Sequence, residues 1–368
     1  MMRQLKSGSI LLNKLYIFLP TLGYGGAEIS LSRVAQFLAK NAGIEIKLIV
    51  AKRLKHEPEL KIKNSLKVEY LNSKKTIFSL FRLFLLINRE KPDVIISTLP
   101  TPNFMVTILK KLRLINSKIV LREANSNYLN WNNSLINKIK GKMSIFSFNN
   151  SDANIFISKE LKENIEKHLS NKKNIVIYNP VFTEDFFQRA NEKVSEINFK
   201  NKEIWITTSR LEHQKGLDLL FDAVRELKDV KNFILLVIGD GSLETVFKNK
   251  YSKLPIKFLG NVQNPLKYLN LADIFFFPSR REGLGNSLIE AQILGKNIIS
   301  SDCPSGPKEI VNFFKNGVLF ESNNLNDLVK SILNIELKQG NTVSNDLINE
   351  FSVARISEQY YDLIQEVI

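Results

Sequence analysis

The chain has 368 residues, of which 44% are hydrophobic and 24% charged. This is an ordinary soluble globular composition, and the length exceeds what one compact core usually supports. The single cysteine, Cys303, excludes a disulfide framework and fits a reducing cytoplasm. The formal net charge of +15 is the unusual quantity.

The N-terminal segment MMRQLKSGSILLNKLYIFLPTLG has a basic start and an apolar run, as a signal peptide does. Asn13 and Lys14 interrupt the run, and no small-residue cleavage site follows. We therefore interpret residues 15–19 as a buried first strand. The longest other apolar stretch, residues 77–87, contains Arg82 and is too short to span a bilayer.

Short apolar runs alternate with amphipathic stretches along the whole chain. In residues 27–40, for example, Leu31, Val34, Ala35 and Leu38 fall on one helical face. The predicted strands are residues 15–19, 46–50, 68–71, 93–97, 118–122, 154–158, 204–209, 233–239, 256–260, 274–279, 297–301 and 317–320. Apolar strands that alternate with helices indicate parallel sheets covered on both faces, so the predicted class is α/β with two doubly wound, Rossmann-like domains.

The predicted domains are residues 1–180 and 181–350, because Asn179-Pro180 breaks the pattern. Residues 351–368 are expected to form a helix that packs back toward the N-terminal domain. Residues 1–180 hold 30 Lys+Arg and 12 Asp+Glu, a charge of +18, whereas the remaining 22 basic and 25 acidic residues give −3. This asymmetry indicates either a local anionic partner or a solvated basic surface. No zinc-ligand spacing, helix-turn-helix or RNA-binding signature favours nucleic acid.

A glycine-rich loop, PTLGYGGAE, follows the first predicted strand. Glycines there let the backbone approach a ligand, and the next helix would present its positive end to an anion. The spacing of Gly23, Gly25 and Gly26 is not G-x-G-x-x-G, and the second strand is followed by Lys52 and Arg53 instead of an acid. NAD is therefore disfavoured. A plain tight turn before a helix remains the alternative.

Two cations, Arg210 and Lys215, lie five residues apart after the first strand of the second half. Such a pair can clamp a diphosphate, since arginine gives a forked contact and lysine a point charge. The alternative is that both are ordinary surface cations. His213 lies between them and is expected to be exposed.

The segment RREGLGNSLIE places Glu282 in a glycine-rich loop and Glu290 in a helix predicted over residues 287–294. Both carboxylates can therefore border one pocket. The alternative for Glu290 is a capping box with Ser287, in which the carboxylate bonds back to the start of the helix. That alternative explains neither Glu282 nor the glycines.

The segment EGLGNSLIE resembles the E-x7-E motif of retaining glycosyltransferase family 4, whose fold, GT-B, has two Rossmann-like domains facing across a cleft. The resemblance covers most of the chain. GYGGAE is similar to the family's N-terminal glycine loop, SRLEHQKGLDLL to its Arg-x4-Lys segment, FLGNVQNPLKYLNLADIFFFPS to the stretch that lines the nucleotide base, and SSDCPSGPKEIV to the strand and loop after the E-x7-E helix.

The resemblance implies a role for each matching residue. Glu282 would hold donor-sugar hydroxyls, Glu290 the ribose hydroxyls, and Arg210 and Lys215 the leaving diphosphate, whose developing charge the protein must neutralise. Backbone N–H groups of Gly283, Leu284, Gly285 and Asn286 would share that task, and Gly25 and Gly26 would let the N-terminal loop close over the phosphates. The family needs no metal or other cofactor, and the chain contains no D-x-D triplet.

In the family, transfer retains the anomeric configuration by front-face attack, so Glu282 would position the sugar and would not act as a covalent nucleophile, unlike the acids of retaining glycosidases. Many relatives carry a histidine near the donor sugar, where this chain has IVLREANSN. Arg122, Glu123 or Asn125 would take its place.

The expected donor is a nucleotide sugar, UDP-hexose or UDP-N-acetylhexosamine by resemblance to enzymes of bacterial surface polysaccharides such as capsule or O-antigen. The expected acceptor is a polyprenyl-diphosphate-linked or other glycan. Residues 74–91 and 137–146, where cations flank apolar side chains, predict peripheral binding to the inner face of the cytoplasmic membrane. The alternatives are a nucleotide-sugar 2-epimerase of the same fold and a non-catalytic protein that binds anionic lipid or nucleic acid.

Overall fold

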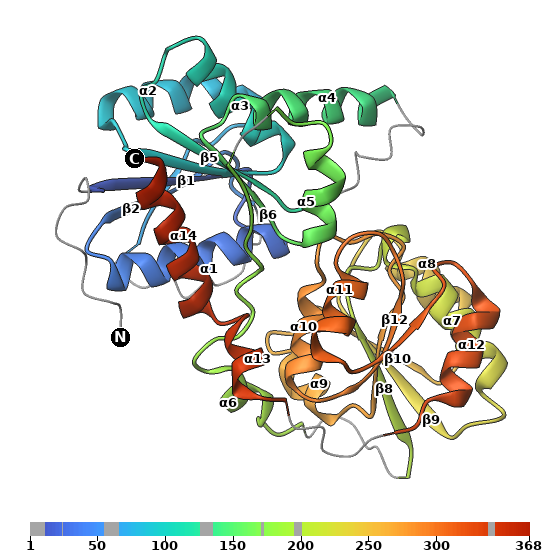
Figure 1. The fold of residues 1–368 in the computed structure, drawn as a ribbon. Helices are drawn as coiled ribbons and strands as arrows, with labels where there is room; N and C mark the ends of the chain where they lie inside the picture. Colours follow the sequence, from blue (N-terminus) through green and yellow to red (C-terminus); the bar gives the residue numbers. More distant parts are fainter. Residues whose placement is uncertain are drawn as a thin grey trace. The chain divides into compact units, whose positions relative to one another are not determined.

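The computed structural model describes residues 12–23, 25–54, 66–125, 135–170, 173–194, 201–337 and 343–368. The chain forms two compact units, one of Met1–Pro180 with Glu350–Ile368 and one of Val181–Asn349 (Figure 1). Each unit is a parallel sheet with helices on its faces. The predicted class of two doubly wound α/β domains is confirmed.

The first unit contains a seven-stranded sheet in the order β3-β2-β1-β4-β5-β6-β7. Its strands are β1 Lys14–Leu19, β2 Glu45–Val50, β3 Lys67–Tyr70, β4 Val94–Thr98, β5 Lys118–Glu123, β6 Ala153–Phe156 and β7 Lys173–Val176. Its helices are α1 Gly26–Asn41, η1 Thr76–Ser79, α2 Leu80–Glu90, α3 Pro100–Lys111, α4 Leu135–Asn149, α5 Lys159–Glu166 and α14 Val353–Val367.

The second unit contains a six-stranded sheet in the order β10-β9-β8-β11-β12-β13. Its strands are β8 Glu203–Thr208, β9 Phe233–Ile238, β10 Ile256–Gly260, β11 Ile274–Phe277, β12 Asn297–Ser301 and β13 Val318–Phe320. Its helices are α6 Phe186–Ala190, η2 His213–Lys215, α7 Leu217–Leu227, α8 Glu244–Lys250, α9 Leu266–Leu271, α10 Asn286–Ile293, α11 Pro307–Phe314, α12 Leu325–Asn334 and α13 Asn345–Asn349.

All twelve predicted strands are present, and β7 is the strand that the sequence pattern missed. It lies at the edge of the first sheet, and its four residues are exposed or only half-buried. An edge strand of this kind lacks the continuous apolar run that marks a buried parallel strand. The apolar part of this strand, Ile175 and Val176, is too short, and its neighbours are too polar, for the sequence pattern to mark it as a strand.

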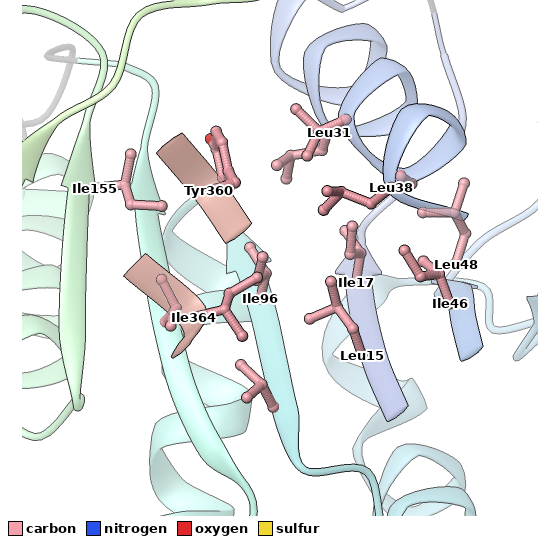
Figure 2. Packing of buried hydrophobic residues seen from close by; sticks show 14 of the residues in the cluster. Leu15, Ile17, Leu31, Leu38, Ile46, Leu48, Ile96, Ile155, Tyr360 and Ile364 are labelled. Atoms are coloured by element: carbon pink, nitrogen blue, oxygen red, sulfur yellow. The ribbon is translucent and has the colours of Figure 1, made fainter. Parts of the chain in front are cut away.

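One core of the first unit lies between the sheet, α1 and α14 (Figure 2). The face of α1 predicted from its spacing is buried there, with Leu31 and Leu38 above β1 and β2. Tyr360 and Ile364 of α14 cover the neighbouring strands near Ile96 and Ile155. The last helix of the chain thus completes the core of the first unit.

Both sheets reverse their strand order at one place. In the first unit the order reverses between β1 and β4, and in the second between β8 and β11. In open parallel sheets, the loops that leave the strands on either side of such a switch point diverge and leave room for a ligand at the carboxyl edge. The switch points are therefore where a site is expected.

Candidate active site

The predicted Arg-x4-Lys and Glu-containing loops leave the two strands at the switch point of the second unit. β8 and β11 are direct neighbours, with Trp205 paired to Ile274 and Ile206 to Phe275. The loop after β8 carries Arg210 and leads to Lys215, and the loop after β11 carries Glu282. The topology thus brings two segments about 70 residues apart to the same edge of the sheet.

Lys215 and Glu282 form an ion pair between these loops. Their side chains are 14% and 10% exposed, and Ser279 donates a second hydrogen bond to Glu282 Oε1 at 2.8 Å. No pattern in the sequence indicated a contact between Lys215 and Glu282, and Glu282 is buried, at 8% exposed as a whole residue. The pair fixes an ammonium group and a carboxylate side by side.

The backbones of the two loops hold the pair in place. The Arg280 N–H donates to the Gln214 carbonyl at 2.8 Å, and the Gln214 side chain donates to the Arg281 carbonyl at 2.8 Å. Gly216, with φ +63°, follows Lys215, and a Cβ there would lie 2.0 Å from the Pro278 carbonyl oxygen. Only glycine permits both this backbone conformation and this close approach.

Arg280 also belongs to the site, although the sequence pattern did not single it out. Its guanidinium makes a forked pair with Asp218 at 2.8 and 2.7 Å, and it also donates to the His213 carbonyl and to Asn323. Burial alone would raise the pKa of Asp218, but the hydrogen bonds and charge of Arg280 hold it below its ordinary value. The signal in the sequence was the arginine pair before Glu282, together with an acid in the first turn of the helix after Lys215.

The loop that carries Arg210 is braced by the loop after β9. A Cβ at Gly239, where φ is +127°, would lie 2.0 Å from the Ser209 carbonyl oxygen. Glu212 accepts hydrogen bonds from the Ser242 backbone and hydroxyl at 3.0 and 2.7 Å, and these bonds lower the pKa of Glu212. Arg210 itself is exposed, so a rigid loop presents its guanidinium to solvent.

The segment from Gly283 to Asn286 leads into the N-terminus of α10. Gly285 is the N-cap, with φ +91°, and a Cβ there would lie 2.8 Å from the Phe277 ring. Leu284 is buried, and a Cβ at Gly306 would lie 2.5 Å from its Cα. The backbone is thus fixed from both sides, and the cap residue has no side chain to cover the helix end. Such an end favours a bound anion.

The capping-box alternative for Glu290 is wrong. The helix begins at Asn286, one residue before the predicted start, so Ser287 lies inside it. The Ser287 hydroxyl donates to the Thr208 carbonyl at 3.1 Å and so ties α10 to the end of β8. Glu290 is half-buried, one turn further along the helix and too far from the N-cap for a capping box.

In the first unit, Gly25 is the N-cap of α1 and Gly26 is its first residue. Tyr24 lies outside the described residues. Glu28 folds over this helix end: a Cβ at Gly25 would lie 2.2 Å from Glu28 Oε2, and Thr21 donates to Glu28 Oε1 at 3.3 Å. A carboxylate here complements the helix dipole, and a phosphate approaching Gly25 on this side would have to displace it. No pattern in the sequence predicts this contact.

The three candidates for the missing histidine have different surroundings. Arg122 is buried and donates to Asn179 at 2.6 Å and Thr98 at 3.3 Å, which favours a structural role over a sugar contact. Glu123 is fully buried, and its Oε1 accepts from the N–H groups of Ala124 and Asn125. Burial raises the pKa of Glu123 to about 8, so the carboxyl group is mostly protonated at neutral pH. Asn125 is half-buried beside it.

Within the described ranges, no group of three or more His, Cys, Asp and Glu side chains is arranged to hold a metal ion. Metal independence stays a prediction.

Two family models match consecutive parts of the chain. The model for glycosyltransferase family 4 matches residues 24–185, and the model for glycosyl transferases group 1 matches residues 188–350. The first matches the unit with the glycine loop, and the second matches the unit that holds Arg210, Lys215, Glu282 and Glu290.

Individual relatives agree with the family models. An uncharacterized glycosyltransferase of Methanocaldococcus jannaschii is 30% identical over 246 residues, which are 63% of this chain and 61% of that protein's length. An undecaprenyl-diphosphate-linked glycan α-1,4-N-acetyl-D-galactosaminyltransferase of Campylobacter jejuni is 27% identical over 373 residues, covering 96% of this chain and 99% of that protein.

The fold is also that of a solved structure. The crystal structure of Anabaena HepE in complex with UDP superimposes with a TM-score of 0.77 at 16% identity, covering 96% of this chain and 100% of that one. At this identity the likeness concerns the fold alone. The chain belongs to glycosyltransferase family 4 and has the GT-B fold of two Rossmann-like domains.

Proposed function

We propose that the protein transfers a hexose or N-acetylhexosamine from a UDP-sugar, with retention of configuration, to a lipid-linked glycan in the synthesis of a bacterial surface polysaccharide. The observation that carries the proposal is the Lys215–Glu282 pair at the switch point of the second sheet, between the loop of Arg210 and the N-terminus of α10. The family membership gives the class of reaction.

The diphosphate of the donor would bind where positive charge collects. Lys215 supplies a half-buried ammonium group, Arg210 an exposed guanidinium on a braced loop, and α10 a helix end without a side-chain cap. These groups would oppose the charge that develops on the leaving diphosphate as the glycosidic bond breaks. Because Glu282 is paired with Lys215, the ammonium group stays oriented before the donor arrives.

Glu282 would then position the sugar. Two donors, Lys215 and Ser279, already engage its Oε1, which reduces its strength as a nucleophile and favours hydrogen bonding to sugar hydroxyls. Retention would follow from attack by the acceptor on the same face from which the diphosphate leaves, and the leaving phosphate would take the acceptor's proton. Glu290, on α10, would bind the ribose hydroxyls.

The acceptor is proposed by analogy with the Campylobacter jejuni relative, whose name specifies an undecaprenyl-diphosphate-linked glycan. A nucleotide-sugar 2-epimerase would require no acceptor. Transfer of labelled sugar to a polyprenyl-diphosphate glycan therefore distinguishes the two reactions, because an epimerase would convert the donor without any transfer.

We expect UDP to raise the melting temperature, because a ligand that binds only the native state stabilises that state. At a UDP concentration a hundred times its Kd, the free energy of unfolding should increase by about 2.7 kcal/mol. Replacing Glu290 with alanine should reduce the affinity for UDP at least about tenfold, the effect of roughly 1.4 kcal/mol. Differential scanning fluorimetry across UDP, GDP and their sugar conjugates measures both effects.

The matched control is Glu226→Ala, which removes an exposed glutamate from α7. It should leave the UDP response unchanged. If GDP raises the melting temperature more than UDP does, GDP becomes the proposed nucleotide. If no nucleotide raises the melting temperature, the proposed donor site is wrong.

We expect transfer to be independent of metal ions, because Arg210, Lys215 and the end of α10 would supply the charge that a divalent cation supplies in metal-dependent transferases. Excess EDTA should leave the rate unchanged within error in a radiolabel transfer assay. A rate that falls with EDTA and returns with Mg²⁺ or Mn²⁺ would contradict this assignment of the diphosphate site.

A further inference from the structure

The outer side of η1 and α2 exposes a stripe of large apolar side chains. Phe78 is 68% exposed, Phe81 67% and Leu85 50%, and their spacing places them on one face of the helix. The opposite side of α2 buries Leu83 and Leu86. We define the α2 stripe as Phe78, Phe81 and Leu85.

Polar contacts at the C-terminal end of α2 fix its orientation. Glu90, its last residue, accepts a hydrogen bond from Tyr16 of β1 and pairs with Lys47 of β2. Burial alone would raise the pKa of Glu90, but its bonds to Lys47, Tyr16 and Arg89 lower the pKa to about 2. The carboxylate therefore stays ionised in its pair above that pH. Because the helix is anchored inward, the stripe points away from the sheet.

Exposed cations flank the stripe on both sides in the sequence and continue across the same layer of helices. Lys74, Lys75 and Lys91 are exposed beside it. Residues 74–142 contain 13 Lys+Arg and three acids, of which Glu123 is buried and Glu90 is paired inward.

α2, α3 and α4 lie along one side of the first sheet (Figure 1), with α3 in contact with both η1 and α4. The exposed start of α4 repeats the mixture of the α2 stripe. Exposed apolar residues of this layer beyond α2 are Leu112, Leu114, Leu135, Ile136 and Ile139, and exposed cations are Lys111, Arg113, Lys138, Lys140 and Lys142. The surface is therefore strongly basic and apolar at once.

We propose that the α2 stripe docks onto an anionic phospholipid bilayer, with Phe78, Phe81 and Leu85 below the headgroups and the flanking lysines among them. Long cations around exposed aromatic side chains are the chemistry that binds such an interface, since lysine reaches phosphates while the rings enter the acyl boundary. No helix in the described ranges is long and apolar enough to span a bilayer. The proposal rests on the proposed function, because a lipid-linked acceptor lies in such a bilayer.

The test uses the full chain, co-sedimented with vesicles of phosphatidylcholine alone or with added phosphatidylglycerol. The wild type should bind the anionic vesicles at low salt, bind neutral ones little, and be released at high salt because salt screens the charges. Two double variants, Phe78→Ser with Phe81→Ser and Lys74→Glu with Lys75→Glu, should each lower binding at least about tenfold.

Matched controls come from exposed residues of the second unit. Val230→Ser with Val246→Ser removes apolar surface, and Lys253→Glu with Lys257→Glu makes the same change in charge. Both should bind vesicles as the wild type does. Equal binding by the α2 variants and the controls, or no binding by the wild type, would overturn the proposal.

A second measurement tests whether a second copy of the chain covers the stripe instead of a bilayer. If the chain is a dimer by size-exclusion chromatography with light scattering and the phenylalanine variant is a monomer, a second copy covers the stripe and the bilayer proposal is wrong. The UDP-induced rise in melting temperature, measured without vesicles, separates the two proposals. If UDP raises the melting temperature but the chain does not bind vesicles, only the bilayer proposal is wrong. If the chain binds vesicles but UDP does not change the melting temperature, only the proposed donor site is wrong.

Discussion

Replacing Glu282 or Lys215 with alanine is expected to lower turnover at least about a hundredfold, the scale of one lost transition-state contact. The structure adds a second reason. The two groups form an ion pair that is 10–14% exposed, so removing either one leaves the other partly buried without its partner. Loss of one partner therefore disturbs the geometry of the other as well as its own contact.

The pairing changes how the effects combine. We expect the Lys215→Met and Glu282→Gln single variants to be almost as impaired as the double variant, because each removes the same ion pair. Residues that act as a unit give non-additive effects of this kind. Steady-state transfer rates for the four proteins of the cycle measure the coupling.

Stability has to be measured in the same proteins. Truncating one partner of a fully buried pair costs about 3–5 kcal/mol, and this partly exposed pair should cost less. Glu282→Gln retains an oxygen that can accept the Ser279 hydroxyl and should be the milder change. The control is Lys248→Met, which breaks the exposed Lys248–Glu244 pair on α8 and should change neither stability nor rate noticeably.

Near wild-type turnover in both alanine variants would show that the switch point of the second unit is not the reaction site. A loss of rate that follows only the loss of folded protein, with a normal rate per folded molecule, would assign the pair a structural role.

The strands and their carboxyl-edge loops could be predicted because buried parallel strands are nearly continuous apolar runs. Arg210, Lys215, Glu282 and the glycines after β11 were found for the same reason, since each follows such a run. The ion pair could not be predicted. It depends on β8 and β11 becoming neighbours, which is decided by the strand order and not by any local pattern.

Helix ends and burial account for the other differences. A serine three residues before a glutamate fits a capping box, but the Gly285 backbone conformation starts α10 earlier and leaves Ser287 to bond with β8. Arg122, at the end of β5, was a candidate for a contact with the donor sugar, but it is buried. Its burial depends on Asn179 and on Tyr360 of α14, which are distant in the sequence.

The contribution of α14 leads to the second large expected effect. Removing residues 350–368 would delete four buried side chains, Ile356, Tyr360, Leu363 and Ile364, from the core between α1 and the first sheet (Figure 2). At about 1.5–3 kcal/mol for each fully buried large apolar side chain, the loss is roughly 6–12 kcal/mol. This equals the whole stability of a typical domain, about 5–15 kcal/mol.

We therefore expect the truncated chain to lose the cooperative unfolding of its first unit while the second unit, whose described core residues all lie between 205 and 335, still unfolds cooperatively. Hydrogen exchange should show loss of protection in α1, β1 and β4 and retained protection in β8, β9 and β11. Equal loss in both units would mean that α14 stabilises the chain by some route other than this core.

Point variants keep the prediction testable if the truncated protein aggregates. Tyr360→Ala and Ile364→Ala should each destabilise the first unit by about 2–5 kcal/mol, because each leaves a cavity in a close-packed core. Asp362→Ala, on the exposed side of the same helix, should change stability by less than about 0.5 kcal/mol. Urea unfolding followed by hydrogen exchange assigns each change to a unit. Tyr360 also interacts with Arg122 at the end of β5. Loss of the Tyr360 side chain should therefore also loosen the end of β5, which carries Glu123. A fragment of the first unit made to test ligand or vesicle binding consequently has to include residues 350–368.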